Sequence, residues 1–197
     1  MTWTLDPAHS SVTFSAKHMM VTTVRGSMKI RDFDLDLDVD NPEASSVRVS
    51  LDAASIDTGQ QMRDDHLRSA DFLKADEFPT IDFVSTRIVR TGDDTGDLHG
   101  ELTIRGVTRP IVLKADFGGI VPNMQGGQRG AFSASAKINR EDFGLTWNVA
   151  LEQGGVLVSK DIKIEIDVAV VSSVEAGREE AEAEAQLTEP EAEAISA

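Results

Sequence analysis

The densest group of side chains that could perform acid–base chemistry is a short charged segment, Arg-Asp-Asp-His-Leu-Arg, at residues 63–68. A histidine beside carboxylates can exchange protons near neutral pH, so this segment could act as a general acid or base. Arginine–carboxylate pairs also form rigid hydrogen-bonded frames that have no catalytic role. We interpret Arg63, Asp64, His66 and Arg68 as such a frame, which holds a lid against the rim of a sheet. An enzyme that uses this cluster remains the alternative.

Further patterns of catalytic or metal-binding residues are weak. The chain has no cysteine, which excludes disulfides and thiolate metal sites. Its four histidines show no strand-like or helical pairing: His9, His18, His66 and His99. The alternating aspartates of residues 32–40 would form a row along one strand face, whereas calcium loops need converging oxygens around a glycine turn. With no phosphate-binding glycine loop or nucleophile elbow, we predict no catalytic residue, no metal and no cofactor.

Charge separates the chain into two parts. The formal net charge is −15, and residues 175–197 contribute −7 through eight Glu and one Arg. No basic face is evident, so nucleic-acid binding is disfavoured. Residues 173–197 are rich in alanine and glutamate but have no apolar stripe, which predicts a disordered tail or a fraying helix. Docking of a partner on this tail is the alternative to a purely solubilising role.

The sequence shows no recognisable signal peptide or transmembrane helix. The first residues, Met-Thr-Trp-Thr-Leu-Asp, have neither a basic nor an apolar signal region. No apolar run approaches the roughly 18 residues that a transmembrane helix needs. We therefore expect a soluble, cytoplasmic protein, periplasmic only if this sequence is a mature form.

Most of residues 1–172 alternate between apolar and polar side chains with a period of two, which predicts half-buried strands. The exception is a helical segment near residues 60–69, between two strands, which predicts one short helical crossover. Short turns elsewhere indicate an all-β domain, an eight-stranded antiparallel barrel, with a two-sheet sandwich as the competing architecture. A change of phase near Ser85 predicts a bulge.

Large and small side chains share the inward faces of these strands, including Ala16, Gly26, Ala115 and Ala134. An eight-stranded barrel can be filled by side chains or can hold one small ligand. The small residues favour an apolar cavity, although large and small residues could also interdigitate in a packed core. The predicted lining is Phe14, Ala16, His18, Met28, Phe83, Gly100, Leu102, Ala115, Phe117, Phe132, Ala134, Ala136 and Ile164.

Several ordered blocks resemble one known family. They include W-T-L-D-P-A-H-S at residues 3–10, S-I-D-T-G at 55–59, R-D-D-H-L-R-S-A-D-F at 63–72, G-E-L-T-I-R-G-V-T-R-P at 100–110 and I-N-R-E-D-F-G-L at 138–145. In this order they are similar to the YceI-like family of polyisoprenoid-binding, lipocalin-like barrels. The resemblance implies an extended barrel whose apolar tunnel holds a polyprenyl or quinone-type lipid.

Together these observations predict a non-catalytic carrier whose partner is an isoprenoid lipid. A homodimer is the other association that we consider. The alternatives are an enzyme acting on an isoprenoid-like molecule and a packed scaffold whose acidic tail docks a partner.

Overall fold

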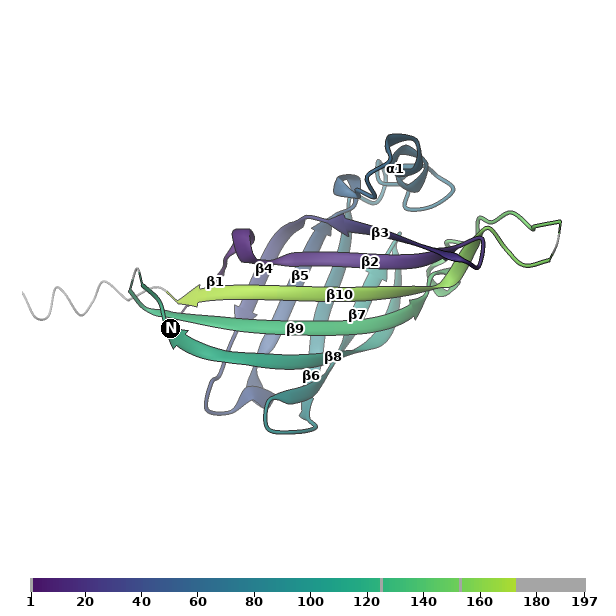
Figure 1. Cartoon of the computed structure of the whole chain (residues 1–197). Coiled ribbons are helices and arrows are strands. Elements are labelled where there is room, and N and C mark those ends of the chain that lie inside the picture. Colours follow the sequence, from purple (N-terminus) through teal and green to yellow (C-terminus); the bar gives the residue numbers. More distant parts are fainter. Residues whose placement is uncertain (1, 125, 153, 173–197) are drawn as a thin grey trace, which may run out of the picture.

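One curled, ten-stranded antiparallel sheet dominates the structure (Figure 1), a computed structural model that describes residues 2–124, 126–152 and 154–172. Its strands are β1 (Trp3–Leu5), β2 (Ser11–His18), β3 (Thr22–Met28), β4 (Ile30–Asp36), β5 (Ser46–Asp52), β6 (Thr80–Arg90), β7 (Thr95–Ile104), β8 (Val107–Pro122), β9 (Gln128–Asn139) and β10 (Val158–Ser172). The helical elements of this part are α1 (Gln61–Arg68) and the 3₁₀ turns η1 (Pro7–His9), η2 (Pro42–Ala44), η3 (Ala53–Ser55) and η4 (Arg140–Phe143). The acidic tail predicted for residues 173–197 lies outside the described residues.

The strand order is β3-β2-β10-β9-β8-β7-β6-β5-β4, with β1 added to the end of β10. From β4 to β10 each strand pairs with its neighbour in the sequence, across short turns and also across the longer connections between β5 and β6 and between β9 and β10. Strand β10 shows why one face of the sheet is buried and the other is exposed. Its Ile162, Ile164 and Ile166 face the interior, whereas Lys163 and Glu165 between them are exposed. The period of two thus separates a dry face from a wet one.

The two edge strands of the sheet, β3 and β4, follow each other in the chain at Lys29. No ladder joins these strands in the described part of the chain, and the end of β5 and the crossover after it pair with the chain beside Lys29 instead. Asp57 exchanges two backbone hydrogen bonds with Ser27, and the Asp52 amide donates to the Lys29 carbonyl at 3.0 Å. Strand β1 approaches β4 as well. Covering the edges in this way removes open backbone groups that would otherwise pair with other chains.

The expected all-β, antiparallel, barrel-like fold is confirmed, and the continuous sheet rules out the sandwich. The described residues contain ten strands instead of the predicted eight, and the short strand at residues 3–5 was not anticipated. The predicted bulge is present as a register shift between Ser85 and Arg87. The helix is also confirmed, with the Gln60 side chain accepting a hydrogen bond from the Arg63 amide at its start.

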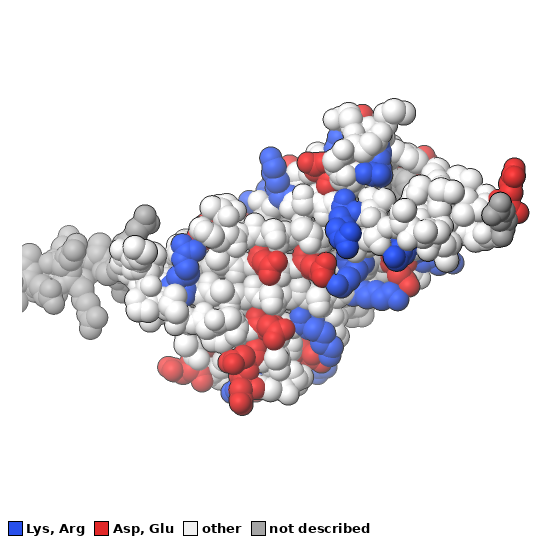
Figure 2. All heavy atoms as spheres, viewed as in Figure 1, with Lys and Arg blue, Asp and Glu red and all other residues white. Residues whose placement is uncertain are grey.

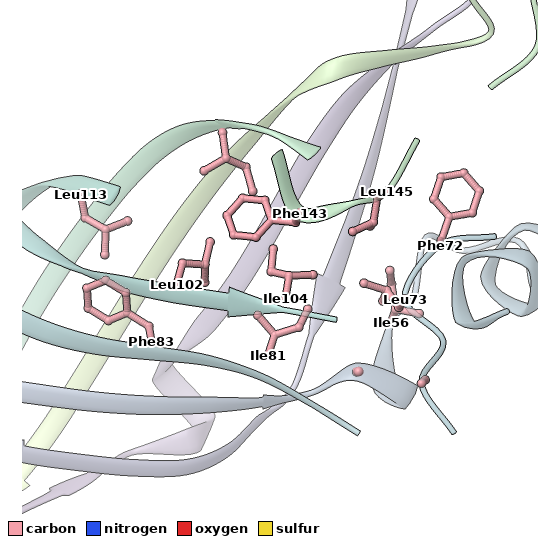
Figure 3. Packing of buried hydrophobic residues seen from close by; sticks show 13 residues of the cluster. Ile56, Phe72, Leu73, Ile81, Phe83, Leu102, Ile104, Leu113, Phe143 and Leu145 are labelled. Atoms are coloured by element: carbon pink, nitrogen blue, oxygen red, sulfur yellow. The ribbon is translucent and has the colours of Figure 1, made fainter. Parts of the chain in front are cut away.

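The interior is packed unevenly. Most of the tightly buried apolar residues gather where the crossover, η4 and strands β6 to β9 meet (Figure 3), whereas Trp3, Val12, Ala169 and Val170 are buried outside this cluster. This core consists of Ala53, Ile56, Phe72, Leu73, Ala75, Ile81, Phe83, Leu102, Ile104, Leu113, Ile138, Phe143 and Leu145. Inward residues farther along the barrel, such as Phe33, Leu35 and Phe132, are only half-buried. A close-packed interior would bury them fully, so this part of the barrel is hollow.

Gly100 of β7 offers a test of the packed region. An added Cβ would lie 2.4 Å from two ring atoms of Phe83 and 2.6 Å from the Val84 carbonyl oxygen. We predict that Gly100→Ala lowers the free energy of unfolding by about 1–3 kcal/mol, the usual cost of overpacking, measured by urea denaturation. Gly118→Ala is the control, because that residue is exposed and its added Cβ would meet only Ala131, at 3.2 Å. Equal stability losses in the two variants would contradict this account.

Candidate ligand cavity

A cavity of about 790 Å³ runs through the hollow part of the barrel. This volume is within the range of pockets that enclose small-molecule ligands, about 300–1,000 Å³. Eleven of the thirteen residues predicted to line it are on its wall: Phe14, Ala16, His18, Met28, Phe83, Leu102, Ala115, Phe117, Phe132, Ala134 and Ile164. Their contact with a ligand stays a prediction.

Gly100 and Ala136 are not on the wall, and neither is Gly26. The two glycines are small because aromatic rings cover them. A Cβ on Gly26 would lie 2.5 Å from the Phe14 ring, and Gly100 lies beneath Phe83. Ala136 packs against the buried core, as Ala134 does, but only Ala134 lines the cavity. The prediction that these small residues open the cavity was therefore wrong, because sequence cannot distinguish a gap filled by a neighbouring ring from a gap left open.

Three alanines do open the interior. Ala115 of β8 and Ala134 of β9 are direct cross-strand partners, and both line the cavity. Cross-strand partners have Cβ atoms about 5 Å apart, so two adjacent positions on the wall carry only methyl groups. Ala16 of β2 adds a third such position. On these three strands the wall therefore carries small, apolar side chains that take up little of the interior.

The crossover between β5 and β6 covers one end of the cavity, with α1 at the top of the view in Figure 1. Asp64 is 5% exposed, and its Oδ1 accepts hydrogen bonds from the amide and the hydroxyl of Thr58, at 2.9 and 2.5 Å. Arg63 donates through Nε to the Thr58 hydroxyl and through Nη2 to the Thr58 carbonyl, at 2.6 and 2.9 Å. The helix is thus bonded to the strand-like segment that precedes it.

Arg68 and His66 complete the frame. Arg68 donates to the Ile56 carbonyl at 3.0 Å and pairs with the Asp65 carboxylate at 3.1 Å. His66 Nε2 lies 2.9 Å from Asp71 Oδ2. The predicted ion pair of the lid is therefore formed by Arg68, whereas Arg63 bonds to neutral oxygens. Each side chain of this cluster binds a neighbouring group of the protein, and Asp64, Asp65 and His66 do not share a hydrogen bond.

Two residues of this end were missed by sequence reasoning, Arg140 and Trp147. Both line the cavity. Trp147 packs edge-to-face on His66, with ring centroids 4.5 Å apart, and lies 5.3 Å from the Phe72 ring. Both residues belong to the connection between β9 and β10, which has no periodic pattern. Arg140 lies in the family-like sequence at residues 138–145, but its position in that sequence did not indicate a role.

Arg140 is a buried cation, 4% exposed, with no carboxylate partner among the described residues. Its guanidinium donates to the carbonyls of Ser159 at 3.0 Å, Val158 at 3.5 Å and Leu145, and it lies 5.9 Å from the Phe72 ring centroid. Burial lowers the pKa of Arg140 from its ordinary value, and the charge of Glu141 acts in the opposite direction. Arginine nevertheless stays protonated in proteins, so a fixed positive charge lies at this end.

The charged residues on the cavity wall are divided between its two ends. Lys17, Arg63 and Arg140 lie at the end covered by α1, together with His18 and His66. The carboxylates Asp93, Asp94 and Asp116 lie at the other end, beside the β6–β7 hairpin, together with Arg90. A positive mouth and a mainly acidic mouth are thus separated by an apolar tunnel.

Within the described residues, no three His, Asp or Glu side chains come together as a metal site. No helix in this part is long and apolar enough to cross a membrane. Every buried side-chain nitrogen or oxygen there has a hydrogen-bond partner. The arrangement favours enclosure of an apolar molecule, and the expected lack of a cofactor stays a prediction.

Arg140 provides a test of this end of the barrel. We predict that Arg140→Lys lowers the free energy of unfolding by about 2 kcal/mol, because a single ammonium group cannot reach three carbonyls and leaves buried acceptors unpaired. Guanidinium denaturation measures the loss. Arg31→Lys is the matched control, since Arg31 is exposed and its contact with Asp32 is 3.6 Å long. A midpoint for Arg140→Lys equal to that of the control would show that these hydrogen bonds contribute nothing.

Comparison with known proteins places the chain in a family. A model described as the YceI-like domain matches residues 3–170. A UPF0312 protein of Staphylococcus aureus strain MSSA476 is 37% identical over 164 residues, 83% of this chain and 93% of the relative. Another UPF0312 protein, from Pseudomonas savastanoi pv. phaseolicola, is 39% identical over 137 residues, 70% of this chain and 71% of that protein.

Solved structures show the same fold. A Campylobacter jejuni YceI protein is 31% identical, with a TM-score of 0.66 over 80% of this chain and 90% of that one. Burkholderia cenocepacia BcnA is 23% identical, with a TM-score of 0.71 over 84% of this chain and 99% of its own. A polyisoprenoid binding domain from Saccharophagus degradans, implicated in plant cell wall breakdown, has a TM-score of 0.64 and 12% identity, covering 88% and 99% of the two chains.

Proposed function

Because the chain belongs to the YceI-like domain family and encloses an apolar tunnel, we propose that it is a non-catalytic carrier of a long-chain isoprenoid lipid. The observation that carries this proposal is the cavity of about 790 Å³, whose charged residues lie only at its two ends. A hydrocarbon chain needs a dry wall without polar partners, which the middle of this tunnel offers. The polyisoprenoid-binding neighbour with the same fold supports the choice of lipid.

Chain burial can supply the affinity. Each CH₂ group removed from water contributes about 0.8 kcal/mol, so a few isoprene units offset the cost of holding one ligand. Such binding depends on the length of the tail more than on its headgroup. We therefore expect polyprenyl and quinone-type tails to compete for the same space.

The alternatives have less support. An enzyme would need Asp64, Asp65 and His66 to act on one substrate, but Asp64 is buried against Thr58 and His66 bonds Asp71. A packed scaffold does not require the open wall formed by Ala115 and Ala134. The cytoplasmic location, the homodimer and the role of the tail stay predictions.

Native mass spectrometry of protein purified from its own host tests the proposal directly. We predict a co-purified adduct whose extracted lipid fragments in isoprene steps. Protein that emerges without ligand, and remains so after incubation with polyprenols and quinones, would overturn the proposed function.

A substitution inside the tunnel tests where the lipid lies. We predict that Ala134→Phe reduces bound lipid about tenfold or more, because losing the burial of two CH₂ groups costs about 1.6 kcal/mol, which exceeds one factor of ten. Bound lipid is quantified by extraction after equilibration with a polyprenol.

Ala131→Phe is the matched control, because Ala131 lies on the same strand with its side chain exposed outside the barrel. Its lipid content should equal that of the unmodified protein. Full lipid retention in folded Ala134→Phe would mean that the ligand binds elsewhere.

A further inference from the structure

The tip of the β2–β3 hairpin exposes three apolar side chains in a row. Met19, Met20 and Val21 are 50%, 60% and 77% exposed. Single exposed apolar residues are common, but a contiguous group at the end of a projecting hairpin is typical of an interaction site. The core does not require these side chains.

The backbone of this turn makes the choice of methionine unusual. Met19 and Met20 have φ values of +50° and +64°, and the Val21 amide donates to the His18 carbonyl at 3.2 Å. Tight turns with two positive φ values strongly favour Asn-Gly, since other side chains are strained there. The sequence instead has methionine at both positions, which keeps two flexible apolar side chains at the tip despite the strain.

The tip lies beside the positive mouth of the cavity. The Met19 amide donates to the Leu157 carbonyl at 2.8 Å, and the Leu157 amide donates to the Val149 carbonyl at 2.9 Å. Leu157 lines the cavity, as do Lys17 and His18 just before the tip. Val149 is 45% exposed. The hairpin and the loop after η4 therefore form one apolar rim, Met19, Met20, Val21 and Val149, next to the tunnel entrance.

Charge separates this mouth from the opposite one. Lys17 lies two residues before the rim and Arg63 lines the same end of the cavity, whereas Asp93, Asp94 and Asp116 line the far end. In Figure 2 the projection at the right of the view is mostly uncharged, with an acidic side chain near its tip and basic side chains, with some acidic ones among them, at its base. Glu152 is the carboxylate on the described part of the rim loop, residues 144–152 and 154–157. Apolar tips flanked by cations suit the surface of an anionic bilayer.

We propose that the rim inserts into the headgroup layer of an anionic phospholipid membrane and so places the positive mouth of the tunnel against the bilayer. This inference rests on the proposed function, because a carrier of a membrane lipid must meet the membrane to exchange its ligand. The acidic mouth would then face water. Methionine side chains are flexible and unbranched, so they can adapt to the irregular boundary between the headgroups and the acyl chains.

Vesicle flotation of the full chain tests the docking. The probes are phosphatidylcholine vesicles with and without phosphatidylglycerol, free of isoprenoid lipid. The unmodified protein should bind the anionic vesicles, more weakly as salt is added. Met19→Asn combined with Met20→Gly should lower that binding about tenfold through loss of apolar insertion, while its melting temperature stays equal or rises because Asn-Gly relieves the strain.

Met124→Ser is the matched control. Met124 is fully exposed in the β8–β9 loop, at the opposite end of β10 from the hairpin, and its loss should leave vesicle binding unchanged. Equal binding by the double variant and the unmodified protein, or no binding of the unmodified protein to anionic vesicles, would overturn the proposal. Ala134→Phe should dock normally while losing its lipid. A wrong ligand assignment would therefore leave the vesicle result unaffected.

Discussion

The buried cation Arg140 connects the segments on which the tunnel entrance depends. Its three carbonyl acceptors lie on the loop after η4 and at the start of β10, and its guanidinium lies near the face of Phe72 from the crossover. A charge buried without a carboxylate is expensive unless its donors are satisfied. These segments must therefore adopt positions that bring their carbonyls together. The positions of Trp147, Phe72 and α1 follow from that requirement, because all of them pack at this junction.

Uneven packing explains how a small barrel can be both stable and hollow. The crossover and η4 bring additional apolar side chains to one end, and there the core is dense. Beyond it, the wall consists mainly of strands, and Ala16, Ala115 and Ala134 present only methyl groups to the cavity. Small residues thus have two opposite uses in one sheet. Gly26 and Gly100 accommodate the rings of Phe14 and Phe83, whereas the alanines make room for a guest.

Periodicity was enough to predict the antiparallel sheet, the crossover helix and the bulge near Ser85, because these depend on local spacing. It also placed most of the thirteen predicted lining residues on the cavity wall, since inward phase follows from alternation. Gly100 was misassigned because its neighbour Phe83 comes from another strand, and ring positions are set by tertiary packing. Arg140 and Trp147 were missed for a related reason. Their connection is irregular, and their roles arise only when distant carbonyls and rings meet.

The position of β10 has a consequence for how the chain folds. This last strand lies inside the sheet, between β2 and β9, and Thr4 of β1 bonds to Val171, 167 residues away. The first strands consequently have no partner on that side until nearly the whole domain has been synthesised. Contacts of such long sequence separation slow folding, because loop closure precedes any gain from pairing. We therefore expect the barrel to close late, once β10 has been synthesised, with β2 as the edge that stays exposed until then.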